Sequence, residues 1–259
     1  MQDPITEHNQ KFWKRSGVFT EYLTEKRIHP SEALLFLKYS QAVLGKRILD
    51  LGCGGGRTSQ VLRQAASHYV GIDSCEQMIE LCRRQYLDTE FHVCSSEDLH
   101  IFPDASFDVV LFSFNGIDCM GHGQRLQSFQ ETRRVLKNGG LYIFSSHNRR
   151  CERVGNPPRL RFVRNPITQI NLLFQFLCQR HRHLKNKSKE IHAKHYDVLN
   201  DPGHDFLFLI YYIDPQDQIT QAQEAGFEIL EMVDAQGERL KFHDDAKHSA
   251  WIYYLARKC

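Results

Sequence analysis

The sequence predicts an α/β protein in which a mostly parallel sheet carries helices on both faces. Two observations support this prediction. From Lys46 onward, short runs rich in β-branched and aromatic residues alternate with segments of helical periodicity. Several of these runs, such as VVLFSF and LYIF, are almost entirely apolar, as strands buried on both sides require. A chain of 259 residues is long enough for one such domain with an elaboration.

The overall composition is that of a folded, soluble protein. Hydrophobic residues make up 41% of the chain and charged residues 25%, which excludes the low hydrophobicity and lopsided charge of disordered chains. No apolar run approaches the roughly 20 residues that span a bilayer, and the first residues lack a hydrophobic secretory core. We therefore expect a cytoplasmic protein without a transmembrane segment. The eight cysteines form no C-x-x-C pair, so we expect reduced thiols and no metal site.

The predicted elements follow in order along one domain, 1–259. Residues 1–45 are expected to form an N-terminal helical cap, because Pro30-Ser31 opens an apolar helix that Gly45 ends. Residues 46–148 contain the strands RILDLG, HYVGID, TEFHVCS, FDVVLFSFN and LYIFSSHN, with helices starting at Arg57, Ser74 and about Gly123. Residues 149–204 form a basic insertion, and residues 205–259 complete the sheet with FEILEMVDAQG and WIYYLARK.

The insertion carries an unusual charge and an apolar patch. Between residues 149 and 190, eleven Lys and Arg side chains stand against two carboxylates, and NLLFQFLCQ reads as a short apolar helix. Four interpretations are open: a lid over an anionic acceptor, an RNA-contacting face, weak contact with a membrane surface, or a solvated surface. The total charge of +2 and the pI of about 8.1 favour a small-molecule partner over nucleic acid.

The most informative stretch is the glycine cluster that follows the first predicted strand. Four glycines within residues 52–56 leave bare backbone at the carboxyl end of a strand, where open α/β sheets bind ligands. A dinucleotide fingerprint would need glycine at position 57, which is Arg57, and a phosphate-binding P-loop would need G-K-[ST]. A plain turn with incidental glycines is the remaining alternative.

A carboxylate ends the second predicted strand, 21 residues after Gly52. Asp73 would lie beside the glycine cluster and could accept hydrogen bonds from the two hydroxyls of a ribose. Alone, this residue could equally cap the next helix, since Ser74 follows it. Together with the glycine cluster, Asp73 predicts a nucleoside site.

These residues carry a resemblance to a known family. Residues 46–148 resemble a class I S-adenosylmethionine-dependent methyltransferase of the small-molecule, methyltransferase type 11-like kind. The motifs ILDLGCGGG, YVGIDSCEQMIELC, SSEDLHIFPDASFDVVLFSF and RRVLKNGGLYIFSSHN occur in the family's order and spacing. The closing strands AGFEILEMVDAQG and WIYYLARK resemble the family's final hairpin. The resemblance implies a Rossmann-like fold with a seven-stranded sheet, and an N-terminal cap and a basic insertion that form a lid.

The resemblance also implies a set of cofactor contacts. Gly52 and Gly54 would lie against the methionine part of S-adenosylmethionine, with Asp50 near its amino group. Asp73 would hold the ribose, and Met78 would pack on the adenine. The sequence departs from many relatives at Ser95, where they have Asp, which leaves the contact with the exocyclic amine open. The remaining implied contacts are Ser96 and Glu97 at the adenine edge and Phe114 and Asn115 at the reacting centre.

Candidates for the chemistry and for the acceptor come from strand ends. Methyl transfer from a sulfonium is an in-line displacement, so positioning supplies much of the rate and no metal is required. His147, just beyond the fifth strand, is suited to act as a general base. Asp118 is the competing candidate for the base, and a purely structural role for His147 is the other alternative. Candidates for the acceptor pocket are His204, Tyr211 and Tyr212. Because side chains alternate along a strand, only one of the two tyrosines can point inward. Tyr22 is a candidate for closing over the cofactor.

The sequence thus predicts methyl transfer to an oxygen or nitrogen of a small metabolite, anionic or neutral, with S-adenosylhomocysteine as the product. Three alternatives are open: an RNA or protein methyltransferase that docks through the basic insertion, a non-catalytic protein that binds S-adenosylmethionine, and a nicotinamide-dependent dehydrogenase.

Overall fold

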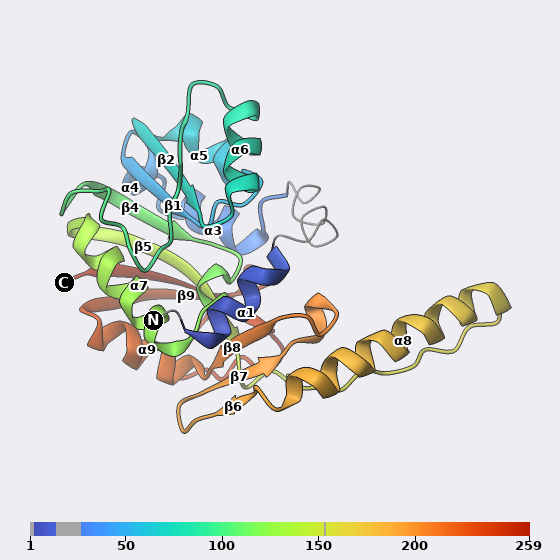
Figure 1. Cartoon of the computed structure of the whole chain (residues 1–259). Coiled ribbons are helices and arrows are strands. Elements are labelled where there is room, and N and C mark those ends of the chain that lie inside the picture. Colours follow the sequence, from blue (N-terminus) through green and yellow to red (C-terminus); the bar gives the residue numbers. More distant parts are fainter. Residues whose placement is uncertain (1–2, 14–26, 153) are drawn as a thin grey trace.

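The computed structural model describes residues 3–13, 27–152 and 154–259 (Figure 1). Its centre is a sheet in which seven strands follow the order β3-β2-β1-β4-β5-β11-β9. The first five strands along this path are parallel, and β11 runs antiparallel to both β5 and β9. The strands are β1 (Arg47–Leu51), β2 (His68–Asp73), β3 (Glu90–Val93), β4 (Phe107–Phe112), β5 (Leu136–Asn148), β9 (Phe227–Asp234) and β11 (Trp251–Lys258).

The predicted mostly parallel, seven-stranded sheet is confirmed, and four short strands extend it. At one edge β10 (Arg239–Leu240) pairs with β9. The other three are β6 (Ile191–His192), β7 (Tyr196–Asn200) and β8 (Leu209–Ile213). Strand β8 joins β5 only where His147 pairs with Tyr212 and Asn148 with Ile213. The sheet therefore forks at the carboxyl end of β5, which brings residues of 205–259 beside His147.

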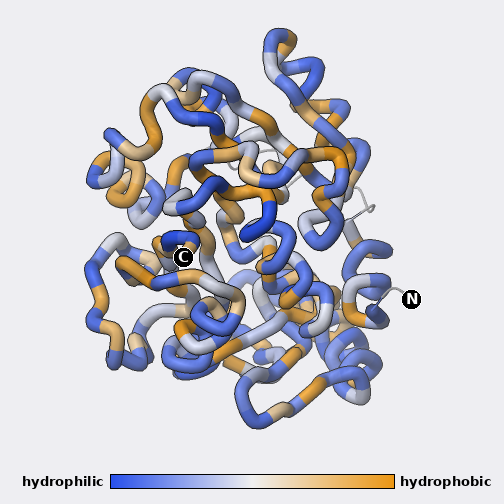
Figure 2. Tube along the Cα trace, turned by 90° about the vertical axis from the view of Figure 1, so that its left-hand side faces the viewer, coloured by the Kyte–Doolittle hydropathy of each residue, from blue (hydrophilic) through white to orange (hydrophobic). Residues whose placement is uncertain are grey.

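Helices cover both faces of the sheet because the central strands are apolar on both sides. In β4, Val109 and Leu111 belong to one buried cluster, while Val110 and Phe112 belong to the other. Figure 2 shows hydrophobic residues interleaved with hydrophilic ones along the trace, as expected where helices bury one face. One cluster includes residues of α3 (Pro30–Lys38), α4 (Ser40–Val43), α5 (Ser59–Ala65) and α6 (Glu76–Gln85), and the other includes residues of α7 (His122–Val135) and α9 (Pro215–Glu224).

The helix boundaries follow local capping chemistry. Pro30 occupies the start of α3, and the backbone N–H of His29 donates to the Glu32 carboxylate at 2.8 Å, which completes a capping box. Gly45, at φ +69°, follows the last turn of α4, as the sequence predicts.

The insertion is dominated by one long helix, α8 (Pro166–Lys187), which projects away from the rest of the molecule (Figure 1). The side chain of Asn165 accepts hydrogen bonds from the backbone N–H groups of Ile167 and Thr168, which caps its first turn. Among the described residues, no helix has both the length and the apolar character to cross a membrane.

Candidate active site

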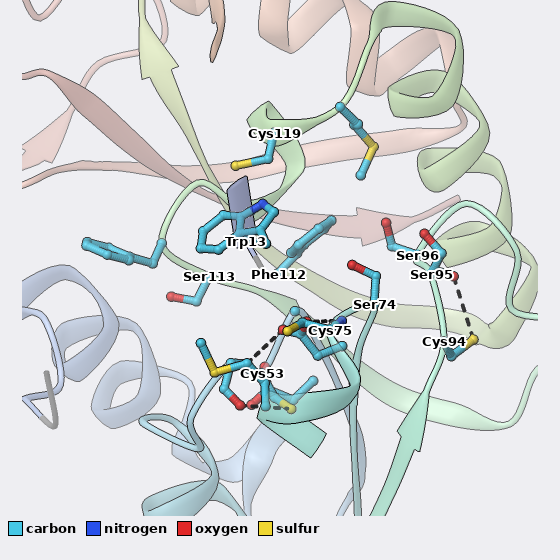
Figure 3. Close-up of a pocket in the computed structure, with 18 of the residues that line it drawn as sticks. Trp13, Cys53, Ser74, Cys75, Cys94, Ser95, Ser96, Phe112, Ser113 and Cys119 are labelled. Atoms are coloured by element: carbon cyan, nitrogen blue, oxygen red, sulfur yellow. Dashed lines mark hydrogen bonds between the residues drawn. The ribbon is translucent and has the colours of Figure 1, made fainter. Parts of the chain in front are cut away.

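A cavity lies at the carboxyl ends of β1, β2 and β4 (Figure 3). The glycine cluster after β1, the tip of β2, and the residues that follow β3 and β4 line it on the sheet side. The N-terminal helix α1 (Pro4–Trp13) lines it from the other side. The cavity therefore occupies the position at which an open parallel sheet binds its ligand.

The glycine cluster exposes bare backbone to this cavity. Gly52 and Gly54 have φ values of +61° and +53°, which favour glycine over other residues. A Cβ atom built on Gly52 would lie 2.9 Å from the ring of Phe112, so a side chain there would displace the ring. A Cβ atom on Gly54 would meet nothing within 4 Å, because this residue faces open space. A ligand can thus approach the main chain at Gly54.

Asp73 joins the tip of β2 to the glycine cluster. One carboxylate oxygen accepts a hydrogen bond from the backbone N–H of Gly54 at 3.0 Å, and the other accepts from Cys75 N–H at 2.8 Å. Burial raises the pKa of Asp73, against the opposing effect of these two N–H donors. Each oxygen keeps further acceptor capacity, and Asp73 lines the cavity, so it can accept two hydroxyl donors from a ligand.

Asp50 forms the floor of the cavity at the end of β1. It is 1% exposed, and one of its oxygens accepts hydrogen bonds from Thr58 Oγ1 at 2.6 Å and from the Tyr69 hydroxyl at 2.7 Å. Burial raises the pKa of Asp50 to about 6, although the two hydroxyl donors oppose this rise. A cationic group placed in the cavity would favour the ionised carboxylate.

Three further residues implied by the resemblance line the cavity on the side of β2 and β3. Met78 of α6 is buried, with 2% exposure, and lines the wall. Ser96 accepts a hydrogen bond from the Ser128 hydroxyl at 3.0 Å. Glu97 accepts hydrogen bonds from the Ser95 hydroxyl and, at 3.0 Å, from Gln124 Nε2. Both Glu97 oxygens therefore have protein partners.

Helix α1, in the predicted N-terminal cap, lines the cavity with residues that sequence reasoning did not name. Figure 3 shows Trp13 reaching into the cavity region from this helix. Asn9 fixes the helix: its amide nitrogen donates to the carbonyl oxygens of Cys119 and Leu209 at 2.9 and 2.8 Å, and its amide oxygen accepts from Leu209 N–H at 3.0 Å. The lining residues of α1 recur at spacings of three and four, which places them on one face of the helix: Thr6, Asn9, Gln10 and Trp13. This spacing was the signal in the sequence that could have identified them. Tyr22, the predicted closing residue, lies outside the described residues.

Arg57 is a further lining residue, which sequence reasoning used to reject other motifs and as the predicted start of a helix but did not assign to the site. Its guanidinium binds the fully buried carboxylate of Glu32 with two contacts, at 2.5 and 2.6 Å, and donates to the Ser113 hydroxyl at 3.1 Å. Burial would raise the pKa of Glu32, but Arg57 lowers it below the ordinary value. This pair places a fixed positive group in the cavity wall and connects α3 to the glycine cluster.

His147 belongs to a buried polar network next to the cavity. Its Nδ1 lies 2.7 Å from one carboxylate oxygen of Asp118, which also accepts from the His147 backbone N–H at 2.6 Å. The other oxygen of Asp118 accepts from Arg125 at 2.5 Å and from the Ser146 hydroxyl at 2.8 Å. Asp118 and Arg125 are fully buried, whereas the His147 side chain retains 15% exposure. Of these three side chains, His147 is the one that keeps contact with solvent.

The turn after β4 connects this network to the cavity. Phe114 and Asn115 have φ values of +52° and +60°, which non-glycine residues seldom adopt and which mark local strain. Phe114 lines the cavity, and Asn115 Nδ2 lies 3.4 Å from His147 Nε2. The amide oxygen of Asn115 is buried and has no hydrogen-bond partner among the described residues. Asn115, Asp118 and His147 stand beside the cavity wall rather than in it.

The two predicted tyrosines of β8 point to opposite sides of the sheet, as alternation requires. Tyr211 is fully buried beneath the guanidinium of Arg125, 4.4 Å from its ring centroid. Tyr212 lies beside His147, with ring centroids 5.1 Å apart, and donates a short hydrogen bond to Asp201. Neither tyrosine lines the cavity described here, and Tyr212 is the one beside the polar network.

His204 lies on the far side of Asp201, 3.5 Å from its carboxylate. Burial alone would raise the pKa of Asp201, but hydrogen bonds from His204 and Tyr212 and the nearby His147 lower it to about 2. Sequence reasoning missed both Asp201 and Arg125; Arg125 binds Gln218 and Gln221, more than 90 residues further along the chain, whereas the partners of Asp201 are the nearby His204 and Tyr212.

Comparisons with known proteins agree with this geometry. Residues 48–140 match a family described as "Methyltransferase domain". The chain is 32% identical over 143 residues to a ubiquinone biosynthesis O-methyltransferase of Hydrogenovibrio crunogenus, covering 53% of this chain and 56% of that protein. The chain spans about half the length of the curated relatives it matches.

Two solved structures are similar over almost the whole chain. An S-adenosylmethionine-dependent methyltransferase of Clostridium acetobutylicum has a TM-score of 0.61 at 14% identity, covering 96% of this chain and 98% of that one. A 1,6-didemethyltoxoflavin-N1-methyltransferase of Burkholderia thailandensis, with 1,6-didemethyltoxoflavin and S-adenosylhomocysteine bound, has a TM-score of 0.58 at 13% identity over 96% and 86% of the chains. The resemblance and the fold predicted from the sequence are confirmed: residues 48–140 match the methyltransferase domain family, and the chain has the fold of class I S-adenosylmethionine-dependent methyltransferases.

Proposed function

We propose that this protein transfers the methyl group of S-adenosylmethionine to an oxygen or nitrogen atom of a small molecule. One observation carries the proposal: the bare backbone of Gly54 faces open space, and the carboxylate of Asp73 lies directly beside it at the next strand tip. This juxtaposition suits a nucleoside with an attached amino-acid chain. The names of the curated relative from Hydrogenovibrio crunogenus and of the structure from Burkholderia thailandensis support a small acceptor.

The donor set around the cavity matches the functional groups of the cofactor. Asp73 would accept hydrogen bonds from the ribose hydroxyls, and Met78 would pack on the adenine. The backbone at Gly52 and Gly54 would lie against the methionine part. Asp50 would pair with the amino group of the cofactor. The positive charge of that group would offset the free-energy cost of burying the ionised Asp50 carboxylate. Ser96 and Glu97 would lie at the adenine edge.

S-adenosylmethionine supplies a methyl group on a positively charged sulfonium. The chain contributes aromatic rings to the cavity, since Trp13, Phe112 and Phe114 line it and can attract positive charge through their faces. Arg57 can interact with a carboxylate at the methionine end while its bidentate pairing with Glu32 holds it in place. Positioning of the two reactants then supplies much of the rate.

His147 is the proposed general base. Donation of its Nδ1–H to Asp118 would fix the tautomer with the lone pair on Nε2. An acceptor hydroxyl or amine would take the place of the Asn115 amide, 3.4 Å from Nε2, and lose its proton to this nitrogen. Asp118 is fully buried, and both of its oxygens already accept two hydrogen bonds each. We therefore assign Asp118 as a residue that positions His147, with Arg125 holding Asp118 in turn.

The test is transfer of label from methyl-labelled S-adenosylmethionine into an extract of the organism that encodes the protein. The expected product is a small labelled molecule, identified by mass spectrometry after the extract is separated by size. The Asp73→Ala variant serves as the negative control. Label in RNA or in protein would overturn the acceptor assignment. Absence of any labelled product, with S-adenosylhomocysteine still bound, would favour a non-catalytic protein.

A further inference from the structure

Helix α8 carries an exposed apolar face along its length. Six of its side chains recur at helical spacing on one side of the helix, and each is 43–72% exposed. The opposite side of the helix is less exposed, with Leu172 and Phe176 partly covered and His183 and Asn186 buried. The six exposed residues, here called the apolar stripe, are Ile167, Ile170, Leu173, Phe174, Leu177 and Leu184.

The apolar stripe lies on a part of the molecule that extends into solvent. Figure 1 shows the extended segment before α8 running outward from the body, and α8 running back along it to the body beside β6 and β7. Phe162 and Val163 of that segment are also exposed, by 83% and 43%. Within the part of the chain that the structure describes, α8 is fixed to the body at its last turns, where Asn186 donates to the Phe206 carbonyl at 3.1 Å and His183 packs on the Phe206 ring.

The charge of the same segment has one sign. Residues 154–189 contain eight of the 33 Lys and Arg side chains and none of the 31 Asp and Glu. The rest of the chain therefore has 25 basic against 31 acidic side chains, so the positive charge is concentrated around α8. Arg180, Lys185 and Lys187 on α8 itself are exposed.

We propose that α8 and its preceding segment dock on the surface of a membrane that contains anionic lipid. An apolar face flanked by Lys and Arg fits the boundary between acyl chains and anionic headgroups, where the helix lies along the surface. A second copy of the chain would bring two segments of like charge together. A nucleic acid would neutralise the basic side chains but would leave the apolar stripe in water. The anionic membrane is the one occupant that satisfies both features.

The proposal does not depend on methyl transfer. It does place the end of the docking helix beside the connection between β7 and β8, since α8 is fixed through Phe206 of that connection, which also carries His204. Docking through α8 would hold that side of the molecule close to the membrane.

Flotation with lipid vesicles tests the proposal on the whole chain. Vesicles of phosphatidylcholine alone would be compared with vesicles that also contain phosphatidylglycerol, at low and at high salt. We expect binding to the anionic vesicles that weakens with salt. The triple variant Ile170→Ser, Phe174→Ser, Leu177→Ser should bind at least about tenfold more weakly, because apolar burial is lost. The double variant Arg180→Glu, Lys187→Glu should weaken binding by a similar factor on anionic vesicles.

Matched changes on the body serve as controls. Leu87→Ser removes an equally exposed apolar side chain, at 85% exposure, and Arg84→Glu reverses an exposed basic side chain. Both should bind vesicles like the unaltered protein, and all variants should keep the same thermal unfolding. Vesicle binding that the α8 variants leave unchanged would overturn the proposal. So would light scattering that shows a dimer lost only in the triple variant, or binding to RNA without binding to vesicles.

Discussion

Residues 46–148 bury their apolar runs in the central sheet, whereas residues 149–204 expose an apolar helix face to solvent. The two regions use similar residue types, as VVLFSF and NLLFQFLCQ show. Their difference lies in what surrounds them. In β4 each side chain meets a helix or a neighbouring strand, while α8 is held by its cap and by contacts at its last turns. The comparison teaches that an apolar pattern predicts an element well, but its burial depends on contacts that are distant in sequence.

The largest effect should come from a residue at the end of the buried region, 46–148. His147 ends the 46–148 core and touches Tyr212 across the fork in the sheet. His147→Gln should lower the rate of label transfer by roughly 10²–10⁴, since a general base contributes about that much. Binding of S-adenosylhomocysteine, measured by calorimetry, should stay the same. His92→Gln, on the exposed side of β3, is the control.

Unchanged transfer by His147→Gln would contradict the proposed base.

A smaller effect concerns the buried floor of the cavity. The pKa of Asp50 is raised to about 6 in the folded state, against about 3.9 in the unfolded chain. At pH values between about 4 and 6, Asp50 binds more protons in the folded state than in the unfolded chain. The contribution of Asp50 to stability is therefore present below about pH 4 and is lost as pH rises through about 6. Asp50→Asn should therefore gain roughly 1–3 kcal/mol in free energy of unfolding relative to the unaltered protein between pH 4 and 7.

Urea unfolding of both proteins at several pH values checks this expectation. The same variant should bind S-adenosylmethionine more weakly, because the charge that would pair with the amino group is removed. Parallel stability curves for the two proteins would contradict the assignment of a destabilised carboxylate to the cavity floor.

The smallest effect should appear in the insertion. Replacing Ile170, Phe174 and Leu177 with serine should change the free energy of unfolding by less than about 0.5 kcal/mol per site, because exposed substitutions seldom do more. Replacing Val110 of β4 with alanine should cost about 2–4 kcal/mol, since this side chain is fully buried. Thermal unfolding distinguishes the two sets. A large loss from the α8 variant would mean that the apolar stripe is part of the folded core.

Sequence reasoning predicted the sheet and the cofactor side of the cavity because both follow from local pattern. Gly52, Gly54, Asp73 and Met78 all line the cavity, since strand tips and the turns after them fall at fixed places in a parallel sheet. The roles of these residues stay predictions, as does the cytoplasmic location.

The other side of the site could not be predicted from local pattern. Helix α1 lines the cavity because Asn9 binds the backbone of Leu209, 200 residues further along the chain. Arg125 reaches Asp118 and Ser146 together with Gln218 of α9. The insertion was expected to form a lid, yet none of its described residues lines the cavity, and the lid remains a prediction.

Calorimetric titration of S-adenosylhomocysteine tests the central claim, that bare backbone at Gly54 and the carboxylate of Asp73 bind the nucleoside. The unaltered protein should show saturable one-to-one binding, and Asp73→Ala should weaken it by roughly 10–150-fold, the worth of a hydrogen bond to a charged group. Asp88→Asn, in the turn that follows α6, should bind like the unaltered protein. No binding by the unaltered protein, or equal affinity in Asp73→Ala, would contradict the claim.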